Sequence, residues 1–404
     1  MDSDKAAASP ISDAERIVTL DFVRGIALMG ILFANITAYA QPYAAYAWPP
    51  ALAGGMTAGD QAIWLFQFTF VDAKFRGLFT LLFGAGLCLF HERAEARGEG
   101  ITRQFVRLLV LLTFGLAHYF LLWRGDILAL YAVWGLVALP ALNWGVERQA
   151  AVGLLALLVG VGLMSAMWWG VVAEPGDPFT SAVLGQAAEE LSLYREGSYG
   201  EIVAHTVAEE SGALIDTLIW VGLTETFGLI LLGMALYRAG LFTGGLDAPT
   251  LRWWGWIGAA GGIAGSCALG LWPLLHGFPY GLTHFVFSGL GAVPHLATTL
   301  GLAALLALWA PRAAASRLGR RLAACGRTAF SNYLGLSLVM VPLFHGWGLG
   351  LFGQFHRIEL LGFVVAGWGL MLAWSQPWLA RFRYGPLEWL WRCLTYGKPV
   401  ALRR

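Results

Sequence analysis

Three polar side chains stand within an apolar stretch near the start of the 404-residue chain, "RIVTLDFVRGIALMGILFANI" at residues 16–36. Asp21, Arg24 and Asn35 would be costly in lipid, since an uncompensated charge at the bilayer centre costs on the order of 3 kcal/mol. On a helix Asp21 and Arg24 face the same way, and Asn35 lies on that stripe roughly 16 Å further along. The stripe indicates either a path through a helix bundle with chemistry at both ends, or an ion pair and a helix–helix hydrogen bond with structural roles.

A second candidate for chemistry is His118, in "GLAHYFLLWRGDILALYA". Histidine is the usual proton acceptor in acyl transfer, and a carboxylate such as Asp126 can hold its tautomer. His118 is equally compatible with a hydrogen-bonded side chain that only fills space in an apolar helix. The polar residues expected at the same outward-facing end, as candidates for one pocket, are Asn35, Asp60, Asp72, Lys74, Arg76, His118, Arg124 and Asp126.

Further polar residues occur in the second half of the chain. Glu225 and His295 are expected near mid-membrane, where they either line the same cavity or bond each other. On the inner side, "GRTAFSNYLG" supplies Arg327, Asn332 and Tyr333. Arg327, Arg24 and the basic C-terminal tail would attract an anionic cytoplasmic ligand, or would simply follow the usual excess of basic residues on that side. The four cysteines lie far apart in no ligand spacing, so we expect no metal site and no disulfide framework.

The elements that must position these residues are membrane-spanning helices. The chain is 58% hydrophobic and only 13% charged, with a mean hydropathy of +0.64. This composition predicts an all-α polytopic membrane protein, and the net charge of +1 implies no nucleic-acid partner. Segments of about 20 apolar residues predict ten transmembrane helices. They are expected at 17–40, 62–90, 104–123, 126–144, 150–172, 214–238, 253–275, 284–310, 327–347 and 357–380.

The connecting segments predict the topology. Basic loops follow the second and eighth segments, and a basic segment follows the tenth, so these regions are expected in the cytoplasm with N-in and C-in termini. We expect a polar tail at 1–15, a helical membrane domain at 16–380 and an amphipathic interfacial helix within 381–404. The acidic region 173–213, between the fifth and sixth helices, is expected outside. The segment 62–90 is expected to break near Asp72, so that 62–76 either spans the membrane or lies at its interface.

Several motifs occur in a fixed order: "RIVTLDFVRGIALMGILFAN", "FRGLFTLLFGAG", "GDILALYA", "GRTAFSNYL" and "YGPLEWLWRCLTYGK". Together they resemble the YeiB-like family of bacterial membrane proteins over nearly the whole chain. That family is distantly similar to the transmembrane acyltransferase group, which includes heparan glucosaminide N-acetyltransferase. Asp21, Arg24 and Gly25 match its Asp-x-x-Arg-Gly pattern, Asn35 matches an Asn implicated in catalysis, and Asp60 matches an aspartate that opens the second helix.

This sequence departs from the acetyltransferase pattern at one position that matters for the chemistry. The acetyltransferase has a catalytic histidine between its first two helices, whereas "TAYAQPYAAYAWPPALAGGMTAGD" contains none. Either His118 supplies the base from another helix, or this branch has lost or changed the reaction.

These patterns lead to the hypothesis of an integral-membrane acyltransferase in a bacterial inner membrane. It would move an acyl group from a cytoplasmic acyl-CoA, its co-substrate, to an envelope or small-molecule acceptor at the outer face. We expect no tightly bound cofactor, lipids as partners, and a homodimer as one compatible assembly. The expected catalytic residues are His118, Asn35, Asp126 and Asp60. The expected substrate- and donor-binding residues are Asp21, Arg24, Asp72, Lys74, Arg76, Arg124, Glu225, His295, Arg327, Asn332 and Tyr333.

Two alternatives remain from the sequence. Ten helices divided into five and five would place the two halves in opposite orientations, as in transporters with inverted repeats. Glu225 and His295 would then form a proton-coupled site for the export of a small molecule. A non-catalytic membrane receptor or assembly factor is the third interpretation.

Overall fold

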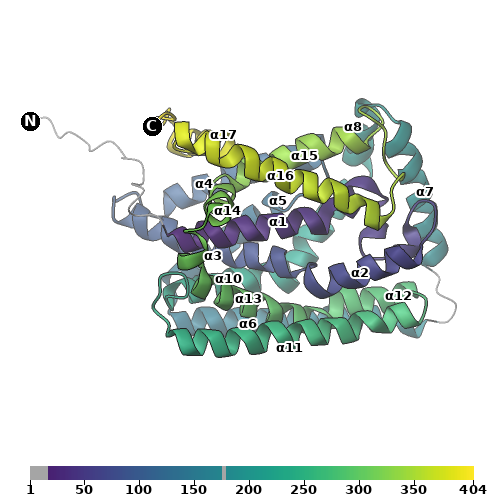
Figure 1. Cartoon of the computed structure of the whole chain (residues 1–404), viewed down its shortest axis with the longest axis horizontal. Coiled ribbons are helices and arrows are strands. Elements are labelled where there is room, and N and C mark those ends of the chain that lie inside the picture. Colours follow the sequence, from purple (N-terminus) through teal and green to yellow (C-terminus); the bar gives the residue numbers. More distant parts are fainter. Residues whose placement is uncertain (1–16, 175–178) are drawn as a thin grey trace, which may run out of the picture.

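The chain folds into a bundle of helices in the computed structural model, which describes residues 17–174 and 179–404 (Figure 1). A backbone in lipid must satisfy its own hydrogen bonds, and helices do so within one segment. The β contact recorded in these ranges is an isolated bridge between Phe382 and Arg403. The all-α polytopic membrane class predicted from the sequence is therefore confirmed. The predicted tail at 1–15 lies outside the described residues.

Eight spans within the described ranges are long and apolar enough to cross a membrane. They are α1 (Val18–Ala40), α2 with α3 (Ala58–Phe70 and Lys74–Glu95), α4 (Gly100–Leu121), α6 (Val146–Ala173), α9 with α10 (Ser211–Asp216 and Phe227–Arg238), α11 (Ala248–Leu275), α12 with α13 (Tyr280–His284 and Ala292–Ala313) and α16 (Arg357–Arg381). Two π-helical segments lie inside these spans. Thr217–Thr226 joins α9 to α10, and Phe285–Leu290 joins α12 to α13.

Two shorter apolar helices, α5 (Leu128–Val137) and α15 (Ala329–Phe344), complete the set in the predicted order. The expectation of one α-helix over 126–144 is wrong in its length. After Val137 the chain continues as a 3-10 helix, Leu139–Asn143, that contains Pro140. Proline lacks the backbone N–H that an α-helix interior requires. Whether α5 and α15 cross the whole bilayer stays a prediction.

The break expected near Asp72 is confirmed. Helix α2 ends at Phe70, α3 begins at Lys74, and Ala73 between them has a left-handed φ of 61°. Helix α2 packs against α11 and α16. Its Trp64 and Phe68 are fully buried. The segment before the break is therefore part of the packed bundle.

Helix α1 runs through the middle of the bundle and packs against α3, α13, α14 (Arg317–Arg327), α15 and α16 (Figure 1). Its closest approach is to α14. A Cβ added at Gly326 would lie 1.8 Å from the backbone oxygen of Asp21, and one at Gly25 would lie 2.0 Å from that of Leu322. Only glycine allows this approach. The glycine that follows Arg24 thus holds the start of α1 against the helix that ends in Arg327.

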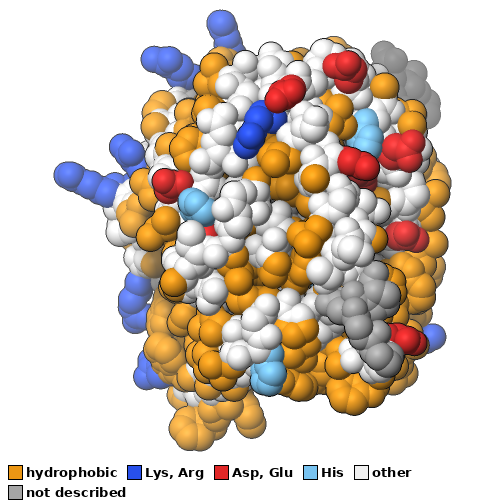
Figure 2. Space-filling view, turned by 90° about the vertical axis from the view of Figure 1, so that its right-hand side faces the viewer, with side chains coloured by type: hydrophobic (Ala, Val, Ile, Leu, Met, Phe, Trp, Pro, Cys, Tyr) orange, Lys and Arg blue, Asp and Glu red, His pale blue; other side chains and the backbone are white. Residues whose placement is uncertain are grey.

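The two ends of the bundle differ in charge. The start of α1, the α3–α4 connection, α14 and the C-terminal helix α17 (Pro386–Tyr396) lie at one end, which we call the basic end (Figure 1). The opposite end carries α7 (Thr180–Glu196), α8 (Tyr199–Ala208) and the 3-10 turns Tyr43–Tyr46 and Pro49–Ala51, and Figure 2 shows acidic side chains on it. The start of α1 and the helix α17 lie at the same end of the described bundle, as N-in and C-in termini require. That the basic end faces the cytoplasm stays a prediction.

Candidate functional site

A cavity of about 250 Å³ opens at the basic end between α1, α3, α4, α15 and α17. Its polar part contains four arginines, Arg24, Arg107, Arg327 and Arg392, against the carboxyl groups of Asp21 and Glu388. A second hollow of about 210 Å³ shares Asp21, Arg24, Arg107 and Arg392, and adds the basic residues Arg93, Arg97 and Lys398 and the carboxyl group of Glu99. The joined opening therefore carries an excess of positive charge, which is suited to a ligand with several phosphates.

Three of the residues predicted to bind a donor meet at this opening. Nη1 of Arg24 lies 3.4 Å from Oδ1 of Asp21, and Arg327 lines the same cavity. The basic tail that was expected to attract an anionic ligand contributes Arg392, whereas Arg107 was not predicted. Arg107 lies two turns into the apolar helix α4, where its guanidinium stacks 4.6 Å from the Trp391 ring of α17. An arginine so far inside a membrane helix was the available signal.

Glu388 ties the C-terminal helix to this cavity. One carboxyl oxygen accepts from the backbone N–H groups of Phe330 and Ser331, and the other accepts from the Ser331 hydroxyl at 2.5 Å. Burial raises the pKa of Glu388, although these hydrogen bonds oppose the change. Glu388 thus satisfies the first N–H groups of α15, and it holds α17 over the cavity.

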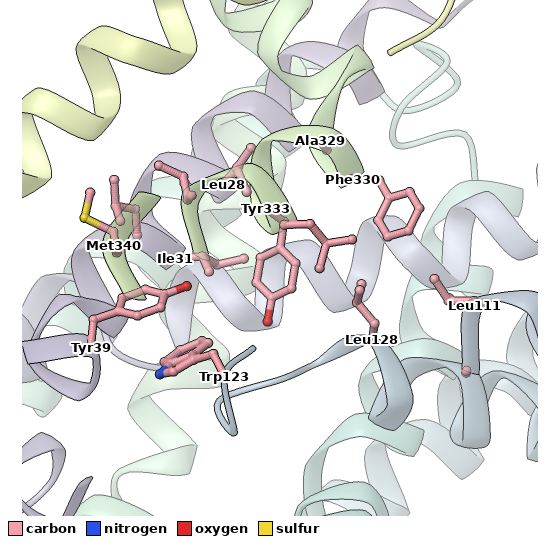
Figure 3. Packing of buried hydrophobic residues seen from close by; sticks show 14 of the residues in the cluster. Leu28, Ile31, Tyr39, Leu111, Trp123, Leu128, Ala329, Phe330, Tyr333 and Met340 are labelled. Carbon is pink, nitrogen blue, oxygen red and sulfur yellow. The ribbon is translucent and has the colours of Figure 1, made fainter. Parts of the chain in front are cut away.

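The deeper part of the cavity is apolar. Its walls include Phe79, Leu82, Phe83, Leu111, Ile127, Leu128, Ala329 and Phe330, and it ends near Tyr131 and Tyr333. Figure 3 shows the Tyr333 ring between Leu128 and Leu111 on one side and the stacked rings of Tyr39 and Trp123 on the other. The cavity as a whole suits an amphiphile with a phosphorylated head and an apolar chain or acyl group.

A chain of four hydrogen-bonded side chains lies behind Tyr333. Nδ1 of His118 is 2.8 Å from Oδ1 of Asp126, and its Nε2 is 2.9 Å from Oγ of Ser337. Oγ of Ser337 is 2.7 Å from the hydroxyl of Tyr39, while Oδ2 of Asp126 accepts from the backbone N–H of Ala129 at 2.7 Å. The His118 and Asp126 side chains are fully buried. The predicted pairing of His118 with Asp126 is therefore present.

One arrangement of protons satisfies every bond in this chain. A carboxylate at Asp126 would accept from Nδ1 of a neutral His118, whose Nε2 would then accept from Ser337. The Tyr39 hydroxyl would in turn donate to Oγ of Ser337. The serine is placed as a nucleophile is placed beside its base.

Ser337 and Tyr39 were not found from the sequence. Ser337 lies in the apolar stretch of α15, and a serine there usually bonds the backbone one turn earlier. It lies 219 positions from His118. No local spacing in the sequence joins the two residues. Only the contact of α15 with α1 brings Ser337 to the Tyr39 hydroxyl.

Tyr333 separates this chain from the cavity. Its ring centroid lies 5.4 Å from that of His118, and its hydroxyl makes two hydrogen bonds of 3.2 Å, to the carbonyl of Gly125 and from the N–H of Ile127. Both are long for bonds of their kind, so they hold the ring weakly. On the far side of His118, a pocket of about 20 Å³ is lined by Ala38 and Trp123, among others, and has room for a water molecule.

Asp60 belongs to a separate group at the other end of the bundle. It begins α2 by a capping box with Thr57. It also accepts from Nδ1 of His356 at 2.9 Å and from the backbone N–H of Arg357 at 2.8 Å. Every oxygen of the Asp60 carboxyl group is thus bonded, and the residue joins α2 to α16. Its position at the opening of the second helix agrees with the resemblance.

Asp72 and Lys74 lie at the break between α2 and α3 and are buried. Oδ1 of Asp72 accepts from Nε2 of Gln67 at 2.9 Å and from the Tyr46 hydroxyl at 3.2 Å. Burial and the nearby Asp72 raise the pKa of Tyr46 well above its usual value, so the phenol stays a donor. Lys74 donates to the carbonyl of Phe68.

Arg76 and Glu225 pair with each other. Nη2 of Arg76 lies 2.7 Å from Oε2 of Glu225, and both side chains keep about a quarter to a third of their exposure. His295 instead packs against the Phe68 ring at 4.8 Å. The alternative that Glu225 and His295 bond each other is therefore wrong, because Glu225 faces α3 and not α13.

Arg124 fastens the outer helices to the bundle. It pairs with Glu190 of α7 at 2.6 Å and with Glu210 before α9. Burial alone would lower the pKa of Arg124, but Glu190 and Glu210 keep it above its usual value. Apart from Asn35, the residues expected to share one outer pocket are thus distributed over separate hydrogen-bonded groups, around Asp60, Asp72, Arg76, His118 and Arg124.

The two asparagines have different surroundings. Asn332 donates to the carbonyl of Cys325 and to the hydroxyls of Thr328 and Ser375, and it accepts from Trp374 at 2.7 Å. These bonds give it a structural role between α14, α15 and α16. Asn35 is half-buried, one helical turn before Tyr39, and makes no side-chain hydrogen bond to the described residues. Within residues 17–174 and 179–404, no group of three or more histidine, cysteine or acidic residues could hold a metal.

The fold defines a polytopic membrane protein, and its internal cavity is basic at the opening and apolar further in. The family described as "Protein of unknown function (DUF418)" matches residues 236–398. The uncharacterized protein YeiB of Escherichia coli is 34% identical over 94% of this chain and 96% of its own length. YxaH of Bacillus subtilis is 29% identical over 98% of each chain. The chain therefore belongs to the YeiB-like family. No solved structure matches it.

Proposed function

We propose that this protein is an integral-membrane acyltransferase that uses an acyl-CoA donor from the basic end and acylates an acceptor at the opposite end. The observation that carries the proposal is the cavity, whose arginine-rich opening leads into apolar walls that include Tyr333, with the His118 ring 5.4 Å behind the Tyr333 ring. The resemblance to transmembrane acyltransferases points to the same chemistry.

The cavity suits each part of an acyl-CoA. The phosphates would lie against Arg24, Arg107 and Arg392 at the opening, where guanidinium groups bind phosphate through paired hydrogen bonds. The acyl group would occupy the apolar part near Leu111 and Phe330. This orientation directs the thioester towards Tyr333, behind which the base lies.

His118 would act as the general base, and Asp126 would hold its tautomer and stabilise the imidazolium that forms. Asn35 keeps the role that the resemblance implies, as a hydrogen-bond donor to the developing oxyanion. Such a donor typically contributes about 10²–10³ in rate. Asp60 has a structural role, since its carboxyl group is fully bonded at the start of α2.

Thermal unfolding of the full chain in lipid nanodiscs, with and without acetyl-CoA and octanoyl-CoA, tests the donor site. A ligand present at about 100 times its dissociation constant stabilises the folded state by about 2.7 kcal/mol. We expect a rise in melting temperature that is lost in Arg24→Ala and Arg107→Ala. Arg321→Ala is the matched control, since Arg321 is exposed on α14 and lines neither hollow. No rise with either thioester would overturn the proposal.

A second candidate function is transport. The Arg76–Glu225 pair and His295 lie within apolar spans, where ionisable groups often mark ion pathways. Glu225 also lies in the π-helical turn Thr217–Thr226, and such turns are frequent at functional sites. Measurement of proton-coupled uptake of a small molecule into vesicles that carry the purified protein, or of its export from them, would test this function.

A further inference from the structure

We propose that Ser337 is the nucleophile of a double-displacement reaction, and that it carries the acyl group as an ester between the donor and the acceptor. The inference rests on the proposed acyl transfer and adds a covalent intermediate to it. It starts from one juxtaposition: Oγ of Ser337 lies 2.9 Å from Nε2 of His118, whose Nδ1 lies 2.8 Å from Asp126.

This arrangement contains every group that nucleophilic catalysis by serine requires. A serine hydroxyl is a weak nucleophile at neutral pH and needs an adjacent base that a third group orients. Asp126 is fixed by the N–H of Ala129, so it has a single position from which to orient His118. The Tyr39 hydroxyl lies 2.7 Å from Oγ of Ser337, and a Tyr39 that donates to Ser337 would direct the serine proton towards His118.

A purely structural role for these hydrogen-bonded side chains would also account for their burial. It would not account for their position close to the donor cavity. Ser337 follows Tyr333 by one turn on α15, and Tyr333 lines the deep end of the donor cavity. On the opposite side, Trp123 stacks 3.9 Å from Tyr39 and lines the small pocket at the acidic end. Ser337 and His118 line neither space themselves: Tyr333 lies between them and the donor cavity, and Trp123, which stacks on Tyr39, lines the small pocket.

Direct attack of an acceptor on the bound thioester would require both spaces to open at the same moment. A serine ester avoids this requirement, because the donor and the acceptor then react in turn at one atom. Rotation of the Tyr333 ring, which two long hydrogen bonds hold, would admit the thioester to Ser337.

Both half-reactions balance. In the first, His118 Nε2 takes the proton of Ser337 Oγ, a C–O bond forms at the thioester carbonyl and the C–S bond breaks. The CoA sulfur leaves with the proton from His118. In the second, the acceptor hydroxyl or amine gives its proton to His118 and attacks the ester carbonyl. The bond to Oγ breaks and Ser337 recovers its proton, so that the sum is acyl-CoA plus acceptor giving acylated acceptor and CoA.

The test is to incubate the full chain in nanodiscs with acyl-labelled acetyl-CoA or octanoyl-CoA in the absence of an acceptor. We expect one acyl group per chain after denaturation, on the peptide that contains Ser337, together with release of one equivalent of free CoA. Ser337→Ala is expected to lose the label and to keep the rise in melting temperature with acyl-CoA. Ser266→Ala is the matched control, since Ser266 is also fully buried but its hydroxyl has no hydrogen-bond partner.

Ser337→Cys keeps the test valid if the alanine variant does not fold. The label should then become a thioester that neutral hydroxylamine removes, whereas the ester of the natural chain resists it. A rise in melting temperature without any label, or a label that persists in Ser337→Ala, would overturn the acyl-serine and leave the acyltransferase proposal standing. Absence of both the rise and the label would overturn both.

Discussion

Nε2 of His118 on α4 lies 2.9 Å from Oγ of Ser337 on α15, and the hydroxyl of Tyr39 on α1 lies 2.7 Å beyond. Three helices thus meet at one hydrogen-bonded chain, between an internal cavity and the acidic end of the bundle. The cavity approaches this chain at Tyr333, so a ligand held by arginines at the basic end points its other end at the base.

Asp126→Asn is expected to slow release of CoA from acyl-CoA by about 10²–10⁴, the usual contribution of general acid–base catalysis. The amide cannot stabilise a charged imidazolium, and it can favour the wrong tautomer of His118. The melting-temperature rise with acyl-CoA should be unchanged, because Asp126 does not line the donor cavity. Asp216→Asn, a change at an exposed carboxylate on α9, is the control. An equal effect of the two variants on CoA release would contradict the assignment.

Glu225→Gln separates acyl transfer from transport. Acyl transfer predicts that this variant keeps most of its activity, because Glu225 pairs with Arg76 away from His118, whereas His118→Ala and Asn35→Ala lose theirs. Transport predicts the reverse order. Both the release of CoA and the proton-coupled flux of the transported molecule are measured in the same vesicles. Equal loss at all three positions, together with lowered melting temperatures, would support neither function.

Arg357→Met is expected to destabilise the fold by about 3–5 kcal/mol, because three buried acceptors lose their donor and each unsatisfied acceptor costs about 1–3 kcal/mol. Arg357 is 1% exposed. Its guanidinium donates to the Gln67 amide oxygen at 3.2 Å and to the backbone oxygens of Ala45 and Tyr46. Denaturant unfolding in mixed micelles gives the free energy. Arg381→Met, at the exposed end of the same helix, should change it by less than about 1 kcal/mol.

The sequence predicted what hydropathy and local spacing determine. The order of the apolar helices, the break at Asp72 and the Asp21–Arg24 contact all depend on residues close together in the chain, and all are present. The pairing of His118 with Asp126 spans a single turn between two helices and was also predicted. These features need no knowledge of how the helices pack.

Partners from distant helices could not be predicted in this way. Nothing in the sequence around Glu225 indicates that it pairs with Arg76, which lies 149 positions away. Nor does anything around Ser337 indicate that it meets His118, since a serine in an apolar helix usually bonds its own backbone. Arg357 and His356 stand at the start of a predicted helix, where charged residues are common, so their contacts with α2 were equally invisible. Which helices touch is decided by packing, and one sequence does not state it.

His345 makes the stability of the acidic end depend on pH. It follows α15, is 3% exposed, and its Nδ1 has no hydrogen-bond partner among the described residues. Burial, assisted by the positive charge of Arg124, lowers the pKa of His345 from 6.5 to about 3. The ring centroids of Tyr194 and Phe352 lie 4.8 Å and 6.0 Å from that of His345.

Because the folded pKa of His345 is depressed, the unfolded chain binds the extra proton between pH 6.5 and about 3. The stability contribution of neutral His345 is therefore complete above pH 6.5, and it falls by about 1.4 kcal/mol for each pH unit below that value. We expect the melting temperature of the natural chain to fall between pH 7 and about pH 4.5 more steeply than that of His345→Gln. The difference between the two proteins isolates this residue, since their carboxylates titrate alike. Parallel curves over that range would show that His345 is protonated equally in the folded and unfolded chains.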